Sequence, residues 1–516
     1  MKNTKKIKIA DKKNLILAII LFVVVIVFSL IVRFQAFSEN TSCGVDGYYH
    51  VTMSQNFFSL CMTREFAKTQ LSVWKENFYD KELGFHALLA GIQLFTGNAD
   101  HAPYHELSIL LIILLISLML LAVHYSNIST YYVIPPLLMA ISPLFFLRIN
   151  MIRPHILSIL FFWLIICLLI SKLKNKQKYI SLFVLGVAYA YSYSSPHLIL
   201  IPLLCYALAS AIYHKQKTEI KNLSFFIVCA VGGVLAGLII HPQFPNTLYL
   251  WYVQGVLVSR QIMGEDFGVG LGLELLSPKG HVYIENIGLY FLALLNVILY
   301  FRFCDKNKNI IFLLTTQLIM LLGFSFSERC IEYTLPAGVL CFALITSHLI
   351  QKYFQKSTWK LHLYLATITL FIYLGTLPFQ LKSLKEASFP AYSNFSKWAK
   401  INLPKDTYIG HIRWGEFPML LQAAPHCTFS MALDPMFTYA LYPEKIRKLE
   451  DFRHLKKSLS LKEIYEILGT NLVFVSKYDP VCDKHIKFSN ARILYKDSMC
   501  TLFLIPPELL GMNNFK

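Results

Sequence analysis

Charged residues are scarce in this sequence. They make up 15% of its 516 residues, whereas soluble globular proteins contain about 25%. Hydrophobic residues account for 55%, and the mean hydropathy is +0.51. This balance excludes an ordinary soluble enzyme. Apolar runs close to the roughly 18 residues needed to cross a bilayer recur from Leu15 to about Phe379. Most of the chain is therefore predicted to lie in a membrane.

Patterns typical of several other protein classes are missing. The 11 cysteines include no CxxC pair and form no cluster with histidines in the sequence, which argues against a structural zinc site. The chain also shows no internal repeat and no low-complexity segment. Its net charge of +18 lies largely in lysine-rich loops between apolar runs, where the positive-inside rule places it. The basic charge therefore does not indicate nucleic-acid binding.

The lysine-rich loops determine the predicted number of helices. If the N-terminal lysines are cytosolic, the basic loops at 172–178, 215–221, 302–308 and 352–360 should be cytosolic too. No small-residue cleavage site follows the first apolar run, so the first helix is expected to be retained. About eleven transmembrane helices satisfy every loop, at 15–32, 106–123, 131–147, 155–171, 179–193, 196–213, 223–240, 287–303, 310–326, 333–350 and 361–379.

The predicted fold is therefore a polytopic α-helical membrane protein with a C-terminal extracytoplasmic α/β domain. The transmembrane domain is predicted to span 1–379, with long outer loops at 33–105 and 241–286. The stretch Gly84–Phe95 is too short to cross and is expected to form a helix on the outer membrane surface. Residues 380–516 contain 19 Lys+Arg, 13 Asp+Glu and short strand-like runs. Because the cytosolic connections are short, any site is expected on the outer face.

The first outer loop holds two groups of ionisable residues. Asp46 is followed by glycine, two tyrosines and His50. A carboxylate at the membrane surface can act as a base, orient a nucleophile or hold a divalent cation with the histidine. The alternative is a solvated acid beside interfacial tyrosines. Further on, Asp80, Glu82 and His86 surround the start of the surface helix, where the acids either cap the helix or take part in a site.

The short outer loops between later helices are also rich in ionisable residues. Arg148, Arg153 and His155 lie in the second outer loop, where two guanidinium groups can bind a phosphate or extend toward lipid headgroups. His197 lies at another outer helix junction. Ionisable residues between apolar spans are functional candidates. A further group lies between the ninth and tenth helices, where the alternative is an Arg329–Glu332 ion pair without another role: Glu328, Arg329 and Glu332.

Two further features leave alternatives open. Trp414 and Glu416 form a Trp-Gly-Glu turn in the C-terminal domain, which either presents an indole and a carboxylate to a ligand or packs a core. Two cysteine pairs lie in segments predicted outside the cytosol, where disulfides can form; the alternative is free thiols. These pairs are Cys43 with Cys61 and Cys482 with Cys500.

The whole arrangement resembles the GT-C superfamily of membrane glycosyltransferases. This superfamily includes oligosaccharyltransferase catalytic subunits, protein O-mannosyltransferases and the lipid A aminoarabinose transferase. Its members carry a catalytic aspartate soon after the first helix and then a surface helix, and Asp46 and residues 84–97 are similar to these parts. Glu328 or Glu332 is similar to a glutamate motif of the oligosaccharyltransferases, and Trp414 begins a segment faintly similar to their C-terminal motif. Their second-loop acidic motif is missing here, which argues against asparagine-linked transfer to protein.

The resemblance implies transfer of a sugar from a polyprenyl-phosphate-linked donor on the outer face of a bacterial inner membrane. The N-terminus would be cytoplasmic and the C-terminal domain periplasmic. The partners would be the lipid-linked sugar, the bilayer and an acceptor glycan, lipid or protein, with Mg²⁺ or Mn²⁺ as a possible cofactor at Asp46. The assigned roles are catalysis for Asp46, His50, Glu328 and Glu332; donor-phosphate binding for Arg148, Arg153, His155, His197 and Arg329; and acceptor binding for Asp80, Glu82, His86, Trp414 and Glu416.

Two other readings remain open at this point. The first is a transporter or flippase for a lipid-linked anion, in which Arg153 and Arg329 line the translocation path. The second is a glycosyltransferase fold that has lost catalysis and only binds a polyprenyl lipid or a partner. The long outer loops and the C-terminal domain argue against a transporter, whereas the sequence does not separate an active enzyme from a binder.

Overall fold

The computed structural model describes residues 2–38, 40–96, 104–124, 128–213, 217–354, 358–454, 456–478 and 490–510. The chain forms two compact units, and each brings together segments that are far apart in the sequence. Unit 1 comprises Met1–Glu39, His105–Leu238 and Leu273–Ser388. Unit 2 comprises Asn40–Tyr104, Ile239–Gly272 and Phe389–Lys516. The units are described separately below.

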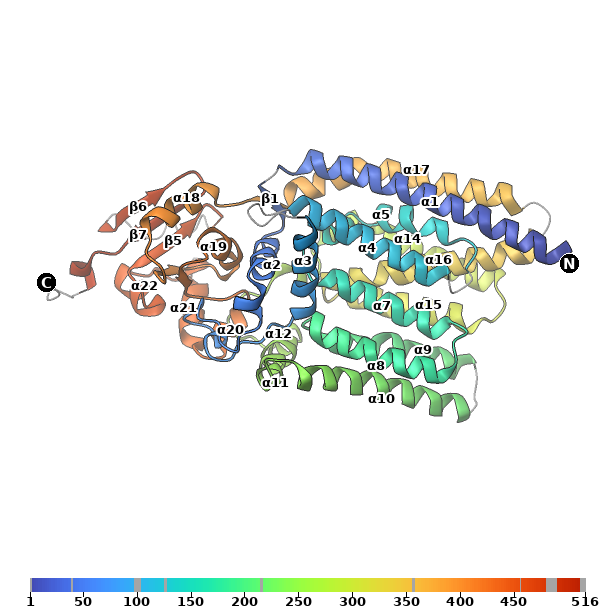
Figure 1. Cartoon of the computed structure of the whole chain (residues 1–516), viewed down its shortest axis with the longest axis horizontal. Helices are drawn as coiled ribbons and strands as arrows, with labels where there is room; N and C mark the ends of the chain where they lie inside the picture. The colour runs from blue at the N-terminus through green and yellow to red at the C-terminus, as the bar shows by residue number, and fades with distance from the viewer. Residues whose placement is uncertain are drawn as a thin grey trace. The chain divides into compact units, whose positions relative to one another are not determined.

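Unit 1 is a bundle of apolar helices (Figure 1). Among the described residues, six helices are long and apolar enough to cross a membrane, or seven if one bent pair is counted as a span. The chain is thus a multi-pass membrane protein by its helix composition. The helices of this bundle are α1 (Lys2–Ala36), α4 (Tyr104–His124), α7 (His155–Ile170), α8 (Asn175–Ser192), α9 (Leu200–Tyr213), α10 (Lys217–Ile240), α14 (Ile287–Phe303), α15 (Lys308–Phe324), α16 (Ile331–Tyr353) and α17 (Thr358–Glu386).

The predicted helix at 131–147 is not continuous. The structure has a 3-10 turn η3 (Tyr131–Val133), then α5 (Ile134–Ala140), and then α6 (Pro143–Ile149) after a bend of 99°. Pro143 cannot continue a preceding helix, because its ring removes an amide hydrogen and clashes with the preceding turn. Ser142 instead begins a new helix, and its hydroxyl accepts a hydrogen bond from the Phe145 amide at 2.9 Å. The bend places Arg148 at the end of a separate short helix.

Polar side chains inside the helix bundle pair with one another. Ser29 of α1 and Tyr373 of α17 share a hydrogen bond of 2.9 Å, and Figure 1 shows these two helices side by side. On α14, the Asn296 amide donates to the Gln317 side chain and to the Gly338 carbonyl, both at 2.9 Å. Water is absent from a bilayer core, so such groups must be satisfied within the protein.

Unit 2 contains a five-stranded mixed sheet with the strand order β4-β3-β5-β7-β6. The β3 strand pairs in parallel with β4 and β5, whereas β7 pairs antiparallel with β5 and β6. The predicted α/β character of the C-terminal region is thus confirmed. The strands are β3 (Tyr408–His411), β4 (Thr428–Phe429), β5 (Leu472–Ser476), β6 (Arg492–Lys496) and β7 (Cys500–Leu504), with helices α18 (Ser393–Asn402), α19 (Phe417–Ala423), α20 (Pro435–Tyr439), α21 (Pro443–Arg453) and α22 (Leu461–Leu468).

Segments that the sequence assigns to outer loops also belong to unit 2. Phe429 of β4 exchanges backbone hydrogen bonds with residues 68 and 70, each 2.8 Å long, and the Arg447 guanidinium donates to the Phe267 carbonyl at 3.0 Å. The compact units therefore do not follow the predicted boundary between 379 and 380. The helices and strands of these segments are β1 (Thr41–Cys43), α2 (Asp46–Gln55), α3 (Leu83–Thr96), α11 (Asn246–Trp251) and α12 (Val258–Ile262).

The structure also bears on the two disulfides considered from the sequence. Cys61 carries a free, buried thiol that contacts the Met53 carbonyl, so the disulfide considered for Cys43 and Cys61 is not formed. Cys500 is also free and buried, whereas Cys482 lies outside the described residues.

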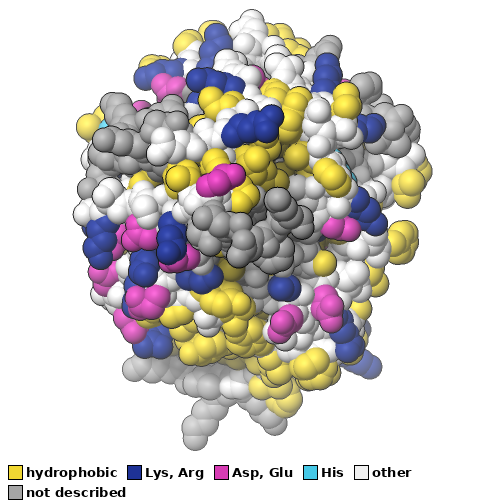
Figure 2. Space-filling model, turned by 90° about the vertical axis from the view of Figure 1, so that its left-hand side faces the viewer, with side chains coloured by type: hydrophobic (Ala, Val, Ile, Leu, Met, Phe, Trp, Pro, Cys, Tyr) yellow, Lys and Arg dark blue, Asp and Glu magenta, His cyan; other side chains and the backbone are white. Residues whose placement is uncertain are grey.

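The face drawn in Figure 2 mixes Lys and Arg with Asp and Glu among apolar side chains. On that face, no single sign of charge dominates in the way expected of a nucleic-acid surface.

The stability of unit 2 is expected to depend on pH through His411. Burial lowers the pKa of this histidine to about 3, whereas an unfolded histidine titrates near 6.5. Below pH ~6.5 the unfolded chain binds a proton that the native state excludes, so stability falls by about 1.4 kcal/mol per pH unit. We expect hydrogen exchange at the amides of β3 and β5, corrected for intrinsic rates, to accelerate by this slope as the pH falls from about 6.5 to 5 and to change little above it. His411→Gln should reduce the slope, and the exposed His454→Gln should not; equal slopes in all three proteins would contradict the prediction.

Candidate functional site

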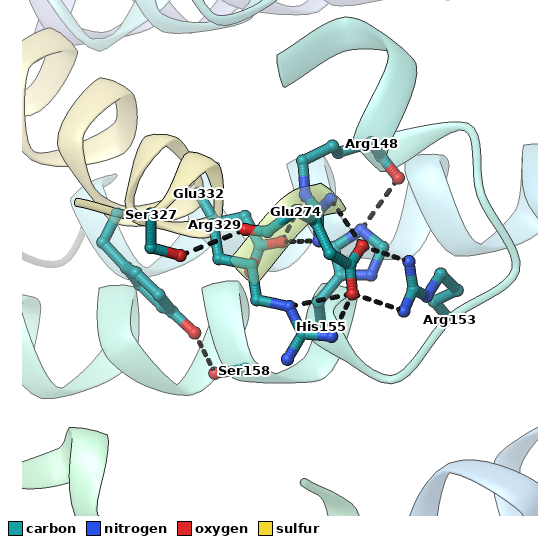
Figure 3. A network of polar contacts seen from close by, with 9 residues as sticks. Arg148, Arg153, His155, Ser158, Glu274, Ser327, Arg329 and Glu332 are labelled. Carbon is teal, nitrogen blue, oxygen red and sulfur yellow. Dashed lines mark hydrogen bonds and ion pairs between the residues drawn. The ribbon is translucent and has the colours of Figure 1, made fainter. Parts of the chain in front are cut away.

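Three arginines and two glutamates form one cluster in unit 1, called here the arginine cluster: Arg148, Arg153, Glu274, Arg329 and Glu332. Figure 3 shows the three guanidinium groups converging on the Glu274 carboxylate. Arg153 binds it through both terminal nitrogens, at 2.5 and 2.8 Å. Arg329 donates through Nε at 3.0 Å and through Nη2, and Arg148 donates at 3.1 Å. Arg148 also pairs with Glu332.

Breaks between helices position these side chains. Arg148 lies in the last turn of α6, Arg153 in the connection to α7, and Arg329 in the 3-10 turn η7 (Glu328–Cys330) that precedes α16. Glu274 is carried by a separate 3-10 turn, η6 (Leu273–Leu275). Its backbone carbonyl accepts a hydrogen bond from the Ser327 hydroxyl at 3.1 Å. Three segments that are distant in sequence, the α6–α7 region, η6 and η7, are thus tied together at one carboxylate.

The arginine cluster retains a positive excess in a largely buried place. Arg148 and Glu332 are buried, and the Glu274 side chain is 17% exposed. Burial alone would raise the pKa of Glu274, but Arg153, Arg329 and Arg148 outweigh burial and hold that pKa well below its usual range. Three guanidinium groups against two carboxylates leave one net positive charge. Because guanidinium groups bind phosphate oxygens in the same paired geometry as carboxylate oxygens, this cluster is suited to an anion.

The structure brings together most of the residues assigned to donor-phosphate binding. His155 lies next to the cluster, where its Nε2 donates to the Arg148 carbonyl at 2.8 Å. His197 is exposed on the 3-10 turn η4 (Pro196–Ile199) and, among the described residues, makes no side-chain hydrogen bond with the cluster. Glu328 lies at the edge, where its backbone amide donates to the Leu276 carbonyl at 3.3 Å.

Two pairings in the arginine cluster differ from those considered in the sequence. Arg329 contacts Glu274, and Glu332 contacts Arg148, so the proposed Arg329–Glu332 pair does not describe the cluster. Glu274 lies in the second long outer loop predicted from the sequence, at 241–286, but it was not among the predicted phosphate-binding residues. The available signal was an isolated acid within the apolar segment Gly-Leu-Glu-Leu-Leu. A lone carboxylate in such a segment needs a cationic partner, and the neighbouring outer loops contain arginines.

A second cluster lies in unit 2 and is called here the histidine cluster: His50, Cys61, Asp80, Glu82 and His86. His50 Nδ1 and His86 Nε2 are 2.9 Å apart, and His86 Nδ1 is 2.8 Å from Asp80 Oδ2. Glu82 Oε2 lies 3.8 Å from His50 Nδ1. All five residues are buried. Asp80, Glu82 and His86, which the sequence places around the start of the surface helix, thus lie together with His50 from α2.

Asp80 also has the capping role that the sequence left open. Its Oδ1 accepts a hydrogen bond from the Glu82 amide at 3.1 Å, just before α3 begins at Leu83. Its own amide donates to the Gln243 side chain at 2.6 Å. One carboxylate thus organises the start of α3 and, through its other oxygen, orients His86.

Asp46 is the first residue of α2 and is partly exposed. His50 follows one helical turn later. Among the described residues, the groups of three or more His, Cys, Asp and Glu with donor atoms close enough to share an ion do not include Asp46. A cation at Asp46 therefore stays a prediction.

The Trp-Gly-Glu turn fits the packing alternative in part. It forms the 3-10 turn η8 (Trp414–Glu416) ahead of α19. Glu416 is buried, and its carboxylate accepts a hydrogen bond from the Ser476 hydroxyl. Trp414 is partly exposed. Contact with an acceptor substrate is therefore better suited to the partly exposed indole of Trp414 than to the buried carboxylate of Glu416.

Comparison with known proteins gives a match at the level of structure. No protein-family model matches the sequence, and no curated protein matches it significantly. The archaeal oligosaccharyltransferase AglB from Archaeoglobus fulgidus, solved with an inhibitory peptide and a dolichol-phosphate, matches with a TM-score of 0.58 and 10% identity. The match covers 89% of this chain and 69% of AglB.

A second solved structure is similar over almost its whole length. ArnT from Cupriavidus metallidurans, bound to undecaprenyl phosphate, matches with a TM-score of 0.57 and 12% identity, covering 96% of this chain and 99% of ArnT. At such identities the likeness shows the fold and not the activity. The chain is structurally similar to GT-C enzymes over most of its length, which confirms the resemblance predicted from the sequence.

Proposed function

We propose that this protein is a membrane glycosyltransferase that transfers a sugar from a polyprenyl-phosphate-linked donor to an acceptor. The observation that carries the proposal is the convergence of three guanidinium groups on one carboxylate in unit 1, within a GT-C-like fold. The fold supports the same reading, because the solved structures of AglB and ArnT contain dolichol-phosphate and undecaprenyl phosphate. The sugar and the acceptor stay open.

In this proposal, Arg153 and Arg329 bind the donor phosphate, with Arg148 and His155 supporting them. Cleavage of the glycosyl bond leaves additional negative charge on the lipid phosphate. Fixed guanidinium groups stabilise charge that develops in the transition state without having to reorganise. Glu274 now occupies the place of an anion among these arginines. Donor binding therefore requires the phosphate to displace this carboxylate, wholly or in part.

Asp46 is proposed to activate or orient the acceptor nucleophile. It is the first residue of α2 and is partly exposed, so an acceptor nucleophile can reach its carboxylate. His50, Glu328 and Glu332 stay candidates for supporting roles. Asp80 and His86 are buried, which leaves little surface for direct contact with an acceptor. Trp414 is a better candidate for acceptor binding because it is partly exposed.

The proposed topology has eleven crossings with a cytoplasmic N-terminus. The C-terminal domain then lies in the periplasm of a bacterial inner membrane, and the chemistry occurs on that side. Support comes from the lysine-rich connections, which all fall on the side of the N-terminus when eleven crossings are counted. Mg²⁺ or Mn²⁺ at Asp46 is part of the proposal. Measuring sugar transfer with and without an added chelator tests it.

Asp46→Asn should abolish sugar transfer. Loss of a general base typically lowers the rate about 100-fold or more, and the neutral amide keeps the size of the side chain. The measurement is turnover of a panel of radiolabelled polyprenyl-phosphate sugars by purified protein in detergent. The exposed Asp266→Asn is the matched control and should keep wild-type turnover. If wild-type protein turns over no donor with or without divalent cations but binds lipid phosphates, a transporter or binder becomes the better account.

Arg153→Ala should weaken donor binding more than it slows turnover. Removing a paired guanidinium contact to phosphate should raise the donor KM about tenfold or more, since a charge-assisted hydrogen bond contributes about 1.5–3 kcal/mol. The exposed Arg260→Ala is the control, because the contacts of its guanidinium are with the exposed Glu265 and the Phe267 ring, and not with the arginine cluster. An unchanged donor KM in Arg153→Ala would remove this residue from the donor site.

Glu274→Gln should strengthen binding of polyprenyl phosphate. The amide keeps the shape of the carboxylate but no longer neutralises the three arginines, so a phosphate competes for them more easily. We expect the Kd to fall several-fold, as measured with undecaprenyl phosphate by a direct binding assay. Glu265→Gln, in the same loop and exposed, should leave the Kd unchanged. A higher Kd for Glu274→Gln would show instead that Glu274 holds the arginines in their binding geometry.

A further inference from the structure

The geometry points to a binding site for a divalent transition-metal ion of the zinc class in unit 2, with His50, Glu82 and His86 as ligands. These three residues supply two ring nitrogens and one carboxylate oxygen, all within 4.8 Å of one another. They come from α2, from the residue before α3 and from the first turn of α3. The site is separate from the arginine cluster and does not depend on the proposed glycosyl transfer.

The donor atoms are already close to the spacing that a bound ion requires. Two nitrogens that each lie about 2.0–2.1 Å from a tetrahedral zinc ion are about 3.3 Å apart. His50 Nδ1 and His86 Nε2 are 2.9 Å apart, and His50 Nδ1 is 3.8 Å from Glu82 Oε2. Shifts of about half an ångström bring these two pairs to that spacing, and the three donor atoms all lie within 4.8 Å of one another.

Neighbouring residues orient the ligands His86 and Glu82. A carboxylate only accepts hydrogen bonds, so His86 Nδ1 donates to Asp80 Oδ2, and the lone pair of a neutral ring is left on Nε2. This is the carboxylate–histidine arrangement that orients metal ligands in proteins. Lys81 lies 3.6 Å from Glu82 Oε1, which leaves Oε2 on the side of the histidines.

The carboxylate of Glu82 provides an independent indication that this cluster binds a cation. Its Oε2 atom is buried and has no hydrogen-bond partner, and the whole residue is only 5% exposed. A buried carboxylate oxygen is costly unless it is paired. A cation between Oε2 and the two ring nitrogens satisfies it. His50 needs only to move its proton from Nδ1 to Nε2 to offer a lone pair at the same place.

The donor set selects the kind of ion. Two imidazole nitrogens and one carboxylate suit Zn²⁺, whereas Mg²⁺ prefers oxygen ligands. Cys61, Asp80 and His86 form a second close group, but there the Nδ1 atom of His86 is already used by Asp80. Three protein ligands leave a fourth position for water. The ion would cross-link α2 to α3 and so fix the helix that carries Asp46 at its first residue.

Metal content tests the site without any assay of transfer. Full-length protein is purified in detergent without chelator and freed of any polyhistidine tag, and its metals are measured by mass spectrometry. We expect about one zinc ion per chain. Alternatively, the protein should take up one added Co²⁺ ion and show the strong visible absorption of tetrahedrally coordinated Co²⁺. His86→Gln and Glu82→Gln should each bind the ion at least tenfold more weakly, and Asp80→Asn about 10- to 100-fold more weakly. His454→Gln, at an exposed histidine, should bind like wild type.

A measurement on wild-type protein guards against variants that fail to fold. Chelation should lower the thermal midpoint, and addition of Zn²⁺ should restore it, because a ligand that binds only the native state stabilises it. The proposal is overturned if wild-type protein neither contains nor takes up Zn²⁺ or Co²⁺, or if a folded His86→Gln variant binds them with wild-type affinity. Asp46→Asn should retain the metal while losing transfer, so the two proposals fail by different measurements.

Discussion

The pairing of Glu274 with three arginines is the interaction on which the arrangement of unit 1 depends. It joins the end of α6, the connection to α7, the turn η6 and the turn before α16 at one carboxylate. Removing one partner from a buried ion pair costs about 3–5 kcal/mol, because the remaining charge stays desolvated. Arg148 is shared with Glu332 as well, so a change at any member affects the whole set. A phosphate group offers the same kind of oxygen acceptors as this carboxylate.

The two clusters differ in chemistry because their donors and acceptors differ. The arginine cluster presents N–H groups only and carries excess positive charge, so it is suited to anions. The histidine cluster presents lone pairs and a carboxylate, so it is suited to a cation. Each cluster lies within one compact unit. Local packing in each unit therefore builds its own binding chemistry.

The similarity to AglB and ArnT at 10–12% identity has a physical explanation. A helix that crosses a bilayer needs only apolar length and internally satisfied backbone, which many sequences provide. Sites need particular side chains at particular positions, and these vary far more easily on a shared fold. The second outer loop illustrates the point: it carries arginines and a histidine here, where the oligosaccharyltransferases that the sequence resembles carry acids.

The sequence by itself determined that the chain is a multi-pass membrane protein with an α/β region after about residue 380, because hydropathy and charge are local properties. It also indicated Arg148, Arg153 and Arg329 as one kind of site, since ionisable residues beside apolar helices need partners. Only the tertiary structure decided the break before Pro143, the assignment of 40–104 and 239–272 to unit 2, and the partners of these residues. Glu274 lies more than 100 residues from Arg148 and Arg153 along the chain, and His50 lies 36 residues from His86. Such pairings follow from how helices and loops pack, which no local pattern specifies.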